Sequence, residues 1–292
     1  SGISLGAVEQ HPVKRIECVE ISTEVAAACR LFGKVNNDAL ADSRLDLFIG
    51  DGRNHLAFSD RLYDVIISQP SNLWIAGMAD LFTKEFYEVC AKHLKPGGLM
   101  CTWIQAYMMK REDFTIVVKT FREQFRHVTM WESVPGGDYF LIGSQDPISI
   151  DADQVQSRIY ERGLEIDLAR IGVGGRDNLL CSYVMADSQI DAFVEEVGSQ
   201  VNSDDNALLE FSAPEGLYSG LMGQAGLFEA MDLEAIRQRD LHFVTGMTDE
   251  RLRRAWMARR KVLAAIGMQH QGRFDEALRL LDSAHDLEPG DM

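Results

Sequence analysis

Short apolar runs alternate with amphipathic stretches along the first half of the chain, and this alternation constrains the fold more than any other feature. Strand-like runs and stretches with helical spacing follow one another in the order 15–20, 23–32, 45–49, 63–68, 83–94, 99–104 and 111–125. The run 63–68 is almost continuously apolar, which is typical of a parallel strand covered on both faces. The alternation predicts an α/β fold built on a doubly wound sheet.

Turn signals mark the edges of this pattern. Lys-Pro-Gly-Gly at 95–98 predicts the end of the preceding helix. Two further strand-like runs, 127–131 and 139–144, flank Pro-Gly-Gly at 135–137, which predicts a closing hairpin. We therefore assign residues 1–145 to the α/β domain.

The remaining residues are predicted to be largely helical. Residues 146–227 form a helical insertion that ends in an acidic loop, and residues 228–292 form a helical C-terminal region. The end of the chain resembles a tetratricopeptide repeat, with two helices meeting at Gly272 and small side chains at Ala277 and Ala284 for close approach. An ordinary antiparallel helix pair is the alternative.

A single repeat unit cannot cover its own apolar face. Leu278, Leu281 and Leu287 would supply that face here. They predict a contact with a protein partner, with a second copy of the chain in a homo-oligomer, or with a further repeat beyond Met292.

The composition of the chain indicates which kinds of ligand and which cellular compartment suit it. Lys and Arg number 29 against 45 Asp and Glu, a net charge of −16 that argues against nucleic acid and suits a cationic substrate such as an amine. The five cysteines form no C-x-x-C pair and predict reduced thiols in a cytoplasmic protein. The histidines lack metal-ligand spacing, so we expect no metal. No apolar stretch reaches the length of a membrane span, although a membrane segment upstream of Ser1 would make this chain the soluble part of an anchored protein.

Ser1-Gly-Ile-Ser-Leu-Gly-Ala resembles the end of a glycine-rich loop that enters a helix. Glycines at Gly2 and Gly6 would let the backbone approach a bound nucleotide closely. The strand that should precede such a loop is absent from the sequence. We therefore expect native chain upstream of Ser1.

Carboxylates end the next two strands. Ligands of an open parallel sheet bind beyond the carboxyl ends of its strands. Glu20, followed by Ile21, is placed to accept hydrogen bonds from two ribose hydroxyls, and Asp51 to accept from an adenine amino group beside Gly52. The alternatives are a solvated glutamate and an ordinary Asp-Gly turn.

The loop after 63–68 is the predicted place of the second substrate. Gln69 and Asn72 supply amide donors and acceptors, and Trp74 supplies an apolar or cation–π wall. Gln69 is also assigned to binding of the co-substrate. By the same strand-end argument, Gln105 and Tyr107 after the next strand are assigned to substrate binding. A loop that merely buries a tryptophan is the alternative.

Several of these segments together resemble the spermidine synthase family, and most of all its bacterial spermidine-synthase-like members. The resemblance rests on Tyr-Asp-Val-Ile-Ile at 63–67, Leu-Phe-Thr-Lys-Glu-Phe-Tyr at 81–87 and Leu-Lys-Pro-Gly-Gly at 94–98. It covers roughly residues 1–145 and implies a class I methyltransferase fold of Rossmann type. It also implies S-adenosylmethionine or decarboxylated S-adenosylmethionine as co-substrate, with Glu20 on the ribose and Asp51 on the adenine.

The chain departs from that family where the chemistry occurs. Aminopropyltransferases carry aspartates in the loop that corresponds to the one after 63–68, and one of them helps to deprotonate the attacking amine. Gln69 and Asn72 stand at the matching places here, and a neutral amide cannot take that proton. We therefore expect little spermidine synthase activity, and Gln69 and Asn72 are predicted to orient the amine rather than to deprotonate it.

Asp204 and Asp205, with Glu210 beside them, are the candidates for a replacement base, if their segment folds back over the site. A solvated acidic loop capped by Asn202 or Ser203 is the alternative. Three functions remain open: aminopropyl transfer to an amine-bearing small molecule, N-methylation of an unknown substrate, and a catalytically inactive module that binds nucleotide and protein.

Overall fold

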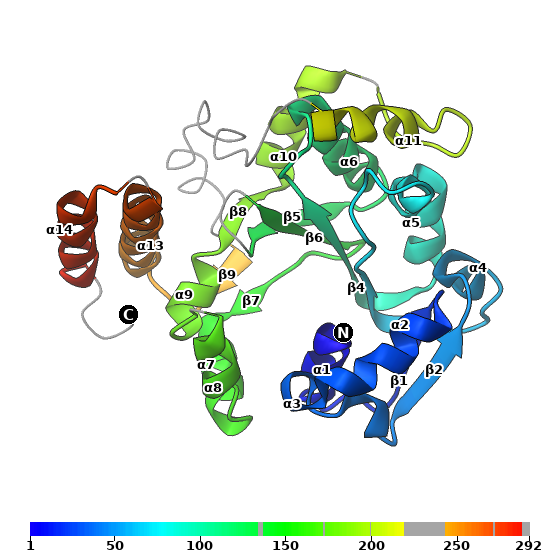
Figure 1. Cartoon of the computed structure of the whole chain (residues 1–292), viewed down its shortest axis with the longest axis horizontal. Coiled ribbons are helices and arrows are strands. Elements are labelled where there is room, and N and C mark those ends of the chain that lie inside the picture. Colours follow the sequence, from blue (N-terminus) through cyan, green and yellow to red (C-terminus); the bar gives the residue numbers. More distant parts are fainter. Residues whose placement is uncertain (134–136, 172, 199, 219–242, 271, 288–292) are drawn as a thin grey trace. The chain divides into compact units, whose positions relative to one another are not determined.

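The computed structural model of the chain describes every residue except 134–136, 172, 199, 219–242, 271 and 288–292 (Figure 1). The chain divides into two compact units, unit 1 (Ser1–Arg61) and unit 2 (Leu62–Met292), and each is described by itself. The domain boundaries at residues 145 and 227 stay predictions, and residues 228–242 of the helical region expected at 228–292 lie outside the described residues.

Unit 1 is built on two parallel strands, β1 (Ile16–Glu20) and β2 (Leu45–Ile49), both of which were predicted. Its helices are α1 (Ile3–Glu9), α2 (Thr23–Ala28), α3 (Gly33–Asn36) and α4 (Gly52–Ala57). The Ser22 hydroxyl caps α2 by accepting a hydrogen bond from the amide of Val25 at 3.2 Å. The α-helix ends sooner than predicted, because residues 29–32 tighten into a 3₁₀ turn.

Unit 2 contains a five-stranded mixed sheet in the order β3-β4-β6-β5-β8. The strands are β3 (Tyr63–Ser68), β4 (Leu94–Gln105), β5 (His127–Glu132), β6 (Asp138–Ser144) and β8 (Tyr183–Ala186). β3 and β4 are parallel, and the other neighbours are antiparallel. This confirms the predicted α/β class and the pairing of β5 with β6, whose turn at 135–136 lies outside the described residues.

Three expectations for this sheet were wrong in detail. β4 begins at Leu94, so the segment 95–98 lies within the strand; it appears there as a shift in the β3–β4 register, with Gly97 at φ 73°. β3 is the edge strand, and its alternate residues Val65 and Ile67 are half exposed rather than covered on both faces. β8 lies in a region expected to be helical, because an apolar run of four residues has no periodicity that separates strand from helix.

The five-stranded sheet is covered by helices that belong to the same unit. α5 (Lys84–Lys92) packs on β4, and α6 (Arg111–Arg122) and α10 (Asp187–Val194) contact each other, with α6 against β6 and α10 against β5 (Figure 1). The other helices before residue 219 are α7 (Ala152–Glu161), α8 (Glu165–Arg170), α9 (Arg176–Leu180) and α11 (Leu208–Ser212), with the 3₁₀ turns η3 (Met78–Phe82), η4 (Glu195–Val197) and η5 (Ala213–Tyr218). Ile150–Asp151 (β7) and Val244–Thr245 (β9) form a short parallel pair.

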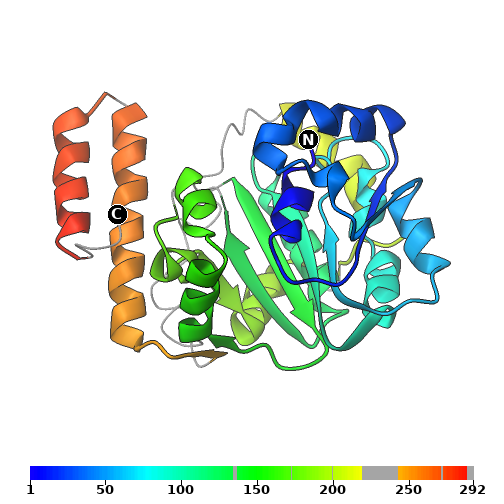
Figure 2. The ribbon, with the colours of Figure 1, turned by 90° about the horizontal axis from the view of Figure 1, so that it is seen from below.

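The chain ends in two helices, α13 (Asp249–His270) and α14 (Phe274–His285), which run antiparallel (Figure 2). Gly272 at the turn has φ 76°, and Ala277 and Ala284 are buried, as predicted. α13 packs through Leu252, Ala255 and Trp256 on a cluster around α9. The helix pair is therefore confirmed as a structure, and its interpretation as a repeat stays a prediction.

Candidate functional site

The nucleotide half of the predicted site lies in unit 1. Glu20 ends β1 and accepts a hydrogen bond from the amide of Ser22 at 3.0 Å. Asp51 follows β2 and caps α4, accepting from the amide of Asn54 at 2.7 Å. Each carboxylate uses one oxygen in this way, and its second oxygen has no partner among the described residues. Both side chains can therefore take a ligand hydrogen bond without losing their local one.

Unit 1 offers a structural reason for the two N-terminal glycines. A Cβ on Gly6 would lie 2.0 Å from the backbone oxygen of Asn36, and a Cβ on Gly2 would lie 2.2 Å from the sulfur of Cys29. Close packing inside unit 1 thus requires both glycines. Gly52 differs, because a Cβ there would meet nothing within 4 Å, and Ile21 is exposed. The roles of all four toward a nucleotide stay predictions.

The acceptor half lies in unit 2, where the carboxyl ends of the parallel strands β3 and β4 share one edge of the sheet. The Asn72 amide, in the loop after β3, donates to the hydroxyl of Tyr107, in the loop after β4, at 2.7 Å. The Trp74 ring meets the Tyr107 ring edge to face, with 5.8 Å between centroids. Three residues predicted separately from two loops thus form one cluster with polar and aromatic faces.

Gln105, which the sequence assigns to substrate binding, is the last residue of β4. Its side chain is 1% exposed, yet neither the amide oxygen nor the amide nitrogen has a hydrogen-bond partner among the described residues. Its cross-strand neighbour is Asp138, the first residue of β6, whose Oδ1 is also buried without a partner. Gln69, by contrast, is exposed. Unpaired buried polar atoms are rare, so these three atoms require an explanation.

Residues 202–218, which we call the strap, fold over both loops as the sequence analysis allowed. The Asn202 side chain is buried and donates to the carbonyls of Ala79 and Phe82 at 3.1 and 3.2 Å. Glu210 accepts from the amide of Gly77 with both oxygens at 3.1 Å. These contacts tie the strap to the loop after β3.

A second group of contacts ties the strap to the loop after β4 and to the start of α6. The Ser212 hydroxyl donates to Asp113 Oδ1 at 2.6 Å, and Glu215 pairs with Lys110. A Cβ on Gly216 would lie 2.2 Å from the carbonyl oxygen of Met108, so the backbones are in close contact. Asp113 is 2% exposed, and this burial raises its pKa.

Asp204 and Asp205, the predicted bases, are exposed in the turn that precedes α11. The backbone amide of Asp204 donates to Glu85 in the first turn of α5 at 2.9 Å. Sequence reasoning missed the buried carboxylate Asp113 and the half-buried Asp138, whose Oδ1 is closed to solvent. Both stand beside a predicted strand or helix end, and nothing in their local sequence signals that they become buried.

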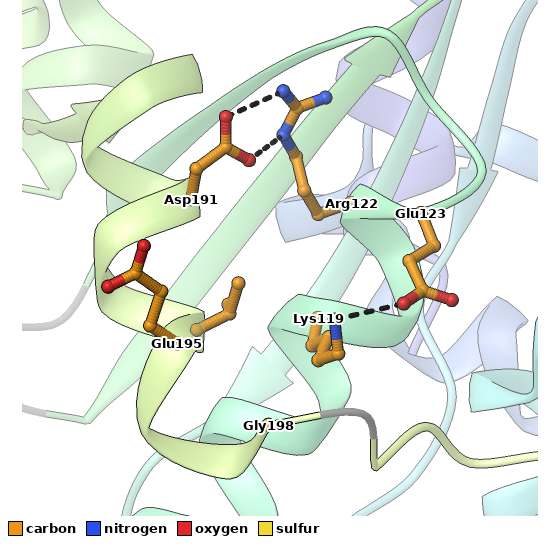
Figure 3. A pocket seen from close by; sticks show the side chains of 7 residues that line it. Lys119, Arg122, Glu123, Asp191, Glu195 and Gly198 are labelled. Atoms are coloured by element: carbon orange, nitrogen blue, oxygen red, sulfur yellow. Dashed lines mark hydrogen bonds and ion pairs between the residues drawn. The ribbon is translucent and has the colours of Figure 1, made fainter.

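A separate hollow between α6 and α10 is lined by charged side chains (Figure 3). Arg122 pairs with Asp191 at 2.7 Å, and Lys119 pairs with Glu123 at 2.9 Å. Both cations that line the hollow are thus paired with an acidic neighbour, and Glu195 adds a further carboxylate to the lining. In the described part of the chain, no group of three His, Cys, Asp or Glu side chains could hold a metal ion, and no helix has the length and apolarity to cross a bilayer.

Comparison with known proteins shows which family the first half of the chain resembles. Residues 2–137 match the family model of the spermine/spermidine synthase domain. The chain is 30% identical to a polyamine aminopropyltransferase of Korarchaeum cryptofilum, over 55% of this chain and 52% of that protein. It is 27% identical to one of Nitrosomonas europaea, over 61% and 57%. The chain thus spans about half the length of these curated relatives. A crystal structure of a probable spermidine synthase from Corynebacterium glutamicum is 21% identical with a TM-score of 0.47, covering 68% of this chain and 66% of that one.

Proposed function

We propose, for a chain whose residues 2–137 belong to the spermine/spermidine synthase domain family, that it transfers an alkyl group from an adenosyl sulfonium to the nitrogen of a small amine. The transferred group is aminopropyl if the co-substrate is decarboxylated S-adenosylmethionine. The curated relatives are named polyamine aminopropyltransferases, which supports aminopropyl over methyl transfer.

The observation that carries the proposal is the cluster of Asn72, Trp74 and Tyr107 where β3 and β4 end. An aromatic wall attracts a cationic amine through its ring faces. The Asn72 oxygen can accept an N–H while the amide nitrogen is held by the Tyr107 hydroxyl. This arrangement orients an amine, and orientation supplies much of the rate when the electrophile is an already activated sulfonium.

The donor is assigned to unit 1. Glu20 would accept from the ribose hydroxyls and Asp51 from the adenine amino group, each through the oxygen that its local backbone bond leaves available. Local hydrogen bonds hold both carboxylates in place before any ligand arrives. Less side-chain entropy is then lost on binding.

Calorimetric titration with methylthioadenosine tests the donor half. Glu20→Gln and Asp51→Asn keep the local backbone hydrogen bonds, since glutamine still accepts from Ser22 and asparagine is an equally good helix cap. Each should weaken binding by roughly 10- to 150-fold, which corresponds to about 1.5–3 kcal/mol for a hydrogen bond to a charged group.

Glu24→Gln and Asp46→Asn serve as matched controls, because they make the same changes at other positions of α2 and β2. The controls should bind like the parent chain. Unchanged affinity in both Glu20→Gln and Asp51→Asn would remove the basis for the nucleotide assignment.

A further inference from the structure

We propose that Gln105 and Asp138 form the subsite for the acceptor's ammonium group, and that Asp138 is the base that removes its proton. The inference rests on the proposed transfer to an amine. Asp138 would accept the proton of the amine, which the amides of Gln69 and Asn72 cannot do.

Two oxygens in this pair lack donors. Gln105 Oε1 and Asp138 Oδ1 are buried, have no partner among the described residues, and belong to cross-strand neighbours whose side chains share one face of the sheet. Opposed residues of an antiparallel pair have Cβ atoms about 5 Å apart, so one small group can reach both. Two neighbouring acceptors call for a ligand with several N–H donors, and a primary ammonium has three.

The position of the pair agrees with the acceptor cluster. Gln105 ends β4, and Tyr107 of the acceptor cluster follows two residues later. The amide of Ala106 donates to the carbonyl of Gly137 at 2.6 Å, so the chain on both sides of the pair is held together. The pair and the acceptor cluster therefore lie at the same end of β4.

The surroundings of Asp138 suit a base. The Trp103 indole N–H donates to its other oxygen and so holds the carboxylate, while burial raises its pKa. Glu132 on β5 is the cross-strand neighbour of Tyr139, whose hydroxyl donates to its carboxylate at 3.3 Å, and Tyr107 follows the end of β4. A raised carboxylate pKa lies closer to that of an amine, about 10, and this lessens the unfavourable free energy of proton transfer.

The proton and electrons balance in this scheme. The ammonium gives one proton to the Asp138 carboxylate and becomes a neutral amine. Its nitrogen lone pair forms a bond to the carbon next to the sulfonium sulfur, and the carbon–sulfur bond breaks with both electrons kept by sulfur. The products are a thioether and a secondary ammonium.

The other carboxylates are less suited to this role. Asp113 is 2% exposed beneath the strap and is bonded to Ser212, so an acceptor cannot reach it without moving the strap. Both oxygens of Glu210 accept from Gly77. Asp138 is half-buried as a residue, and its Oδ1 is closed to solvent and has no partner among the described residues.

The test compares Asp138→Asn with the parent chain in calorimetric binding of 1,3-diaminopropane, 1,4-diaminobutane and spermidine, and in methylthioadenosine release from decarboxylated S-adenosylmethionine. We expect amine affinity to fall at least tenfold, and release at pH 7.5 to fall about 100-fold or more, the usual contribution of a general base. In the parent, the rate should rise with pH as Asp138 ionises. In Asp138→Asn it should keep rising toward the amine's own pKa of about 10, because only the free amine then reacts.

Asp64→Asn is the matched control. Asp64 is an exposed aspartate near the start of β3, the end of that strand away from the acceptor cluster. Gln105→Leu should weaken amine binding while keeping the ionisation limb of Asp138 in the rate profile. A parent chain that binds none of the three amines, or an Asp138→Asn variant with unchanged affinity and pH profile, overturns the inference. Methylthioadenosine binding is measured separately and reports on the proposed function alone.

Discussion

The acidic side chains at the strand ends of unit 1 are held by local hydrogen bonds, whereas the strap of unit 2 is held by hydrogen bonds between segments far apart in the sequence. Glu20 bonds a backbone amide two residues away, and Asp51 bonds one three residues away. In unit 2, Gly77 is bonded by Glu210 across 133 residues, and Ala79 by Asn202 across 123. A local contact forms together with the turn that contains it, whereas a long-range contact exists only when the whole unit has folded. Substitutions should therefore have small effects in the first region and large effects in the second.

The largest expected effect belongs to Asn202→Ala. Its side chain satisfies the carbonyls of Ala79 and Phe82 and the amide of Leu209, and all of these bonds are buried. Leaving such groups unpaired should lower the free energy of unfolding by about 3 kcal/mol. Urea denaturation followed by circular dichroism measures this. Gln200→Ala, two residues earlier and exposed, is the control, and a loss below about 1 kcal/mol in Asn202→Ala would break the comparison.

Tyr107→Phe should have an intermediate effect on activity. Phenylalanine keeps the ring against Trp74 but removes the hydroxyl that holds the Asn72 amide. A less well oriented amide should lower kcat/KM for amine alkylation about tenfold, with little change in stability. Initial rates of methylthioadenosine release measure it. Tyr160→Phe, an exposed tyrosine of α7, should leave the rate unchanged. Equal rates in both variants would mean that the cluster does not orient the acceptor.

Ser22→Ala should have the smallest effect, although it removes a helix cap. The Ser22 hydroxyl accepts from Val25 at the start of an exposed helix of six residues. Losing a cap usually lowers stability by about 1 kcal/mol. A shift in melting temperature of unit 1 by differential scanning calorimetry is the measurement, with Ser43→Ala in an exposed loop as reference. An effect as large as that of Asn202→Ala would show that local contacts are not the weaker class.

Sequence reasoning was most successful where a feature is contained in one short segment. The strands at 16–20, 45–49 and 63–68 and the C-terminal helix pair all follow from local periodicity and turn residues. The position of Glu20 and Asp51 at strand ends follows from the same patterns. β8 was missed because its four apolar residues become a strand only by pairing with β5.

The amino-acid sequence by itself determined the α/β alternation, the acidic residues at the ends of β1 and β2, and the presence of the amides Gln69 and Asn72 where the family carries acids. Only the tertiary structure decided that Gln105 and Asp138 are cross-strand neighbours with unpaired buried oxygens, and that the strap covers Asp113. The physical reason is that strand register and burial depend on contacts between distant segments. A carboxylate's pKa and its availability to a ligand depend on that burial, which residue type and spacing do not specify.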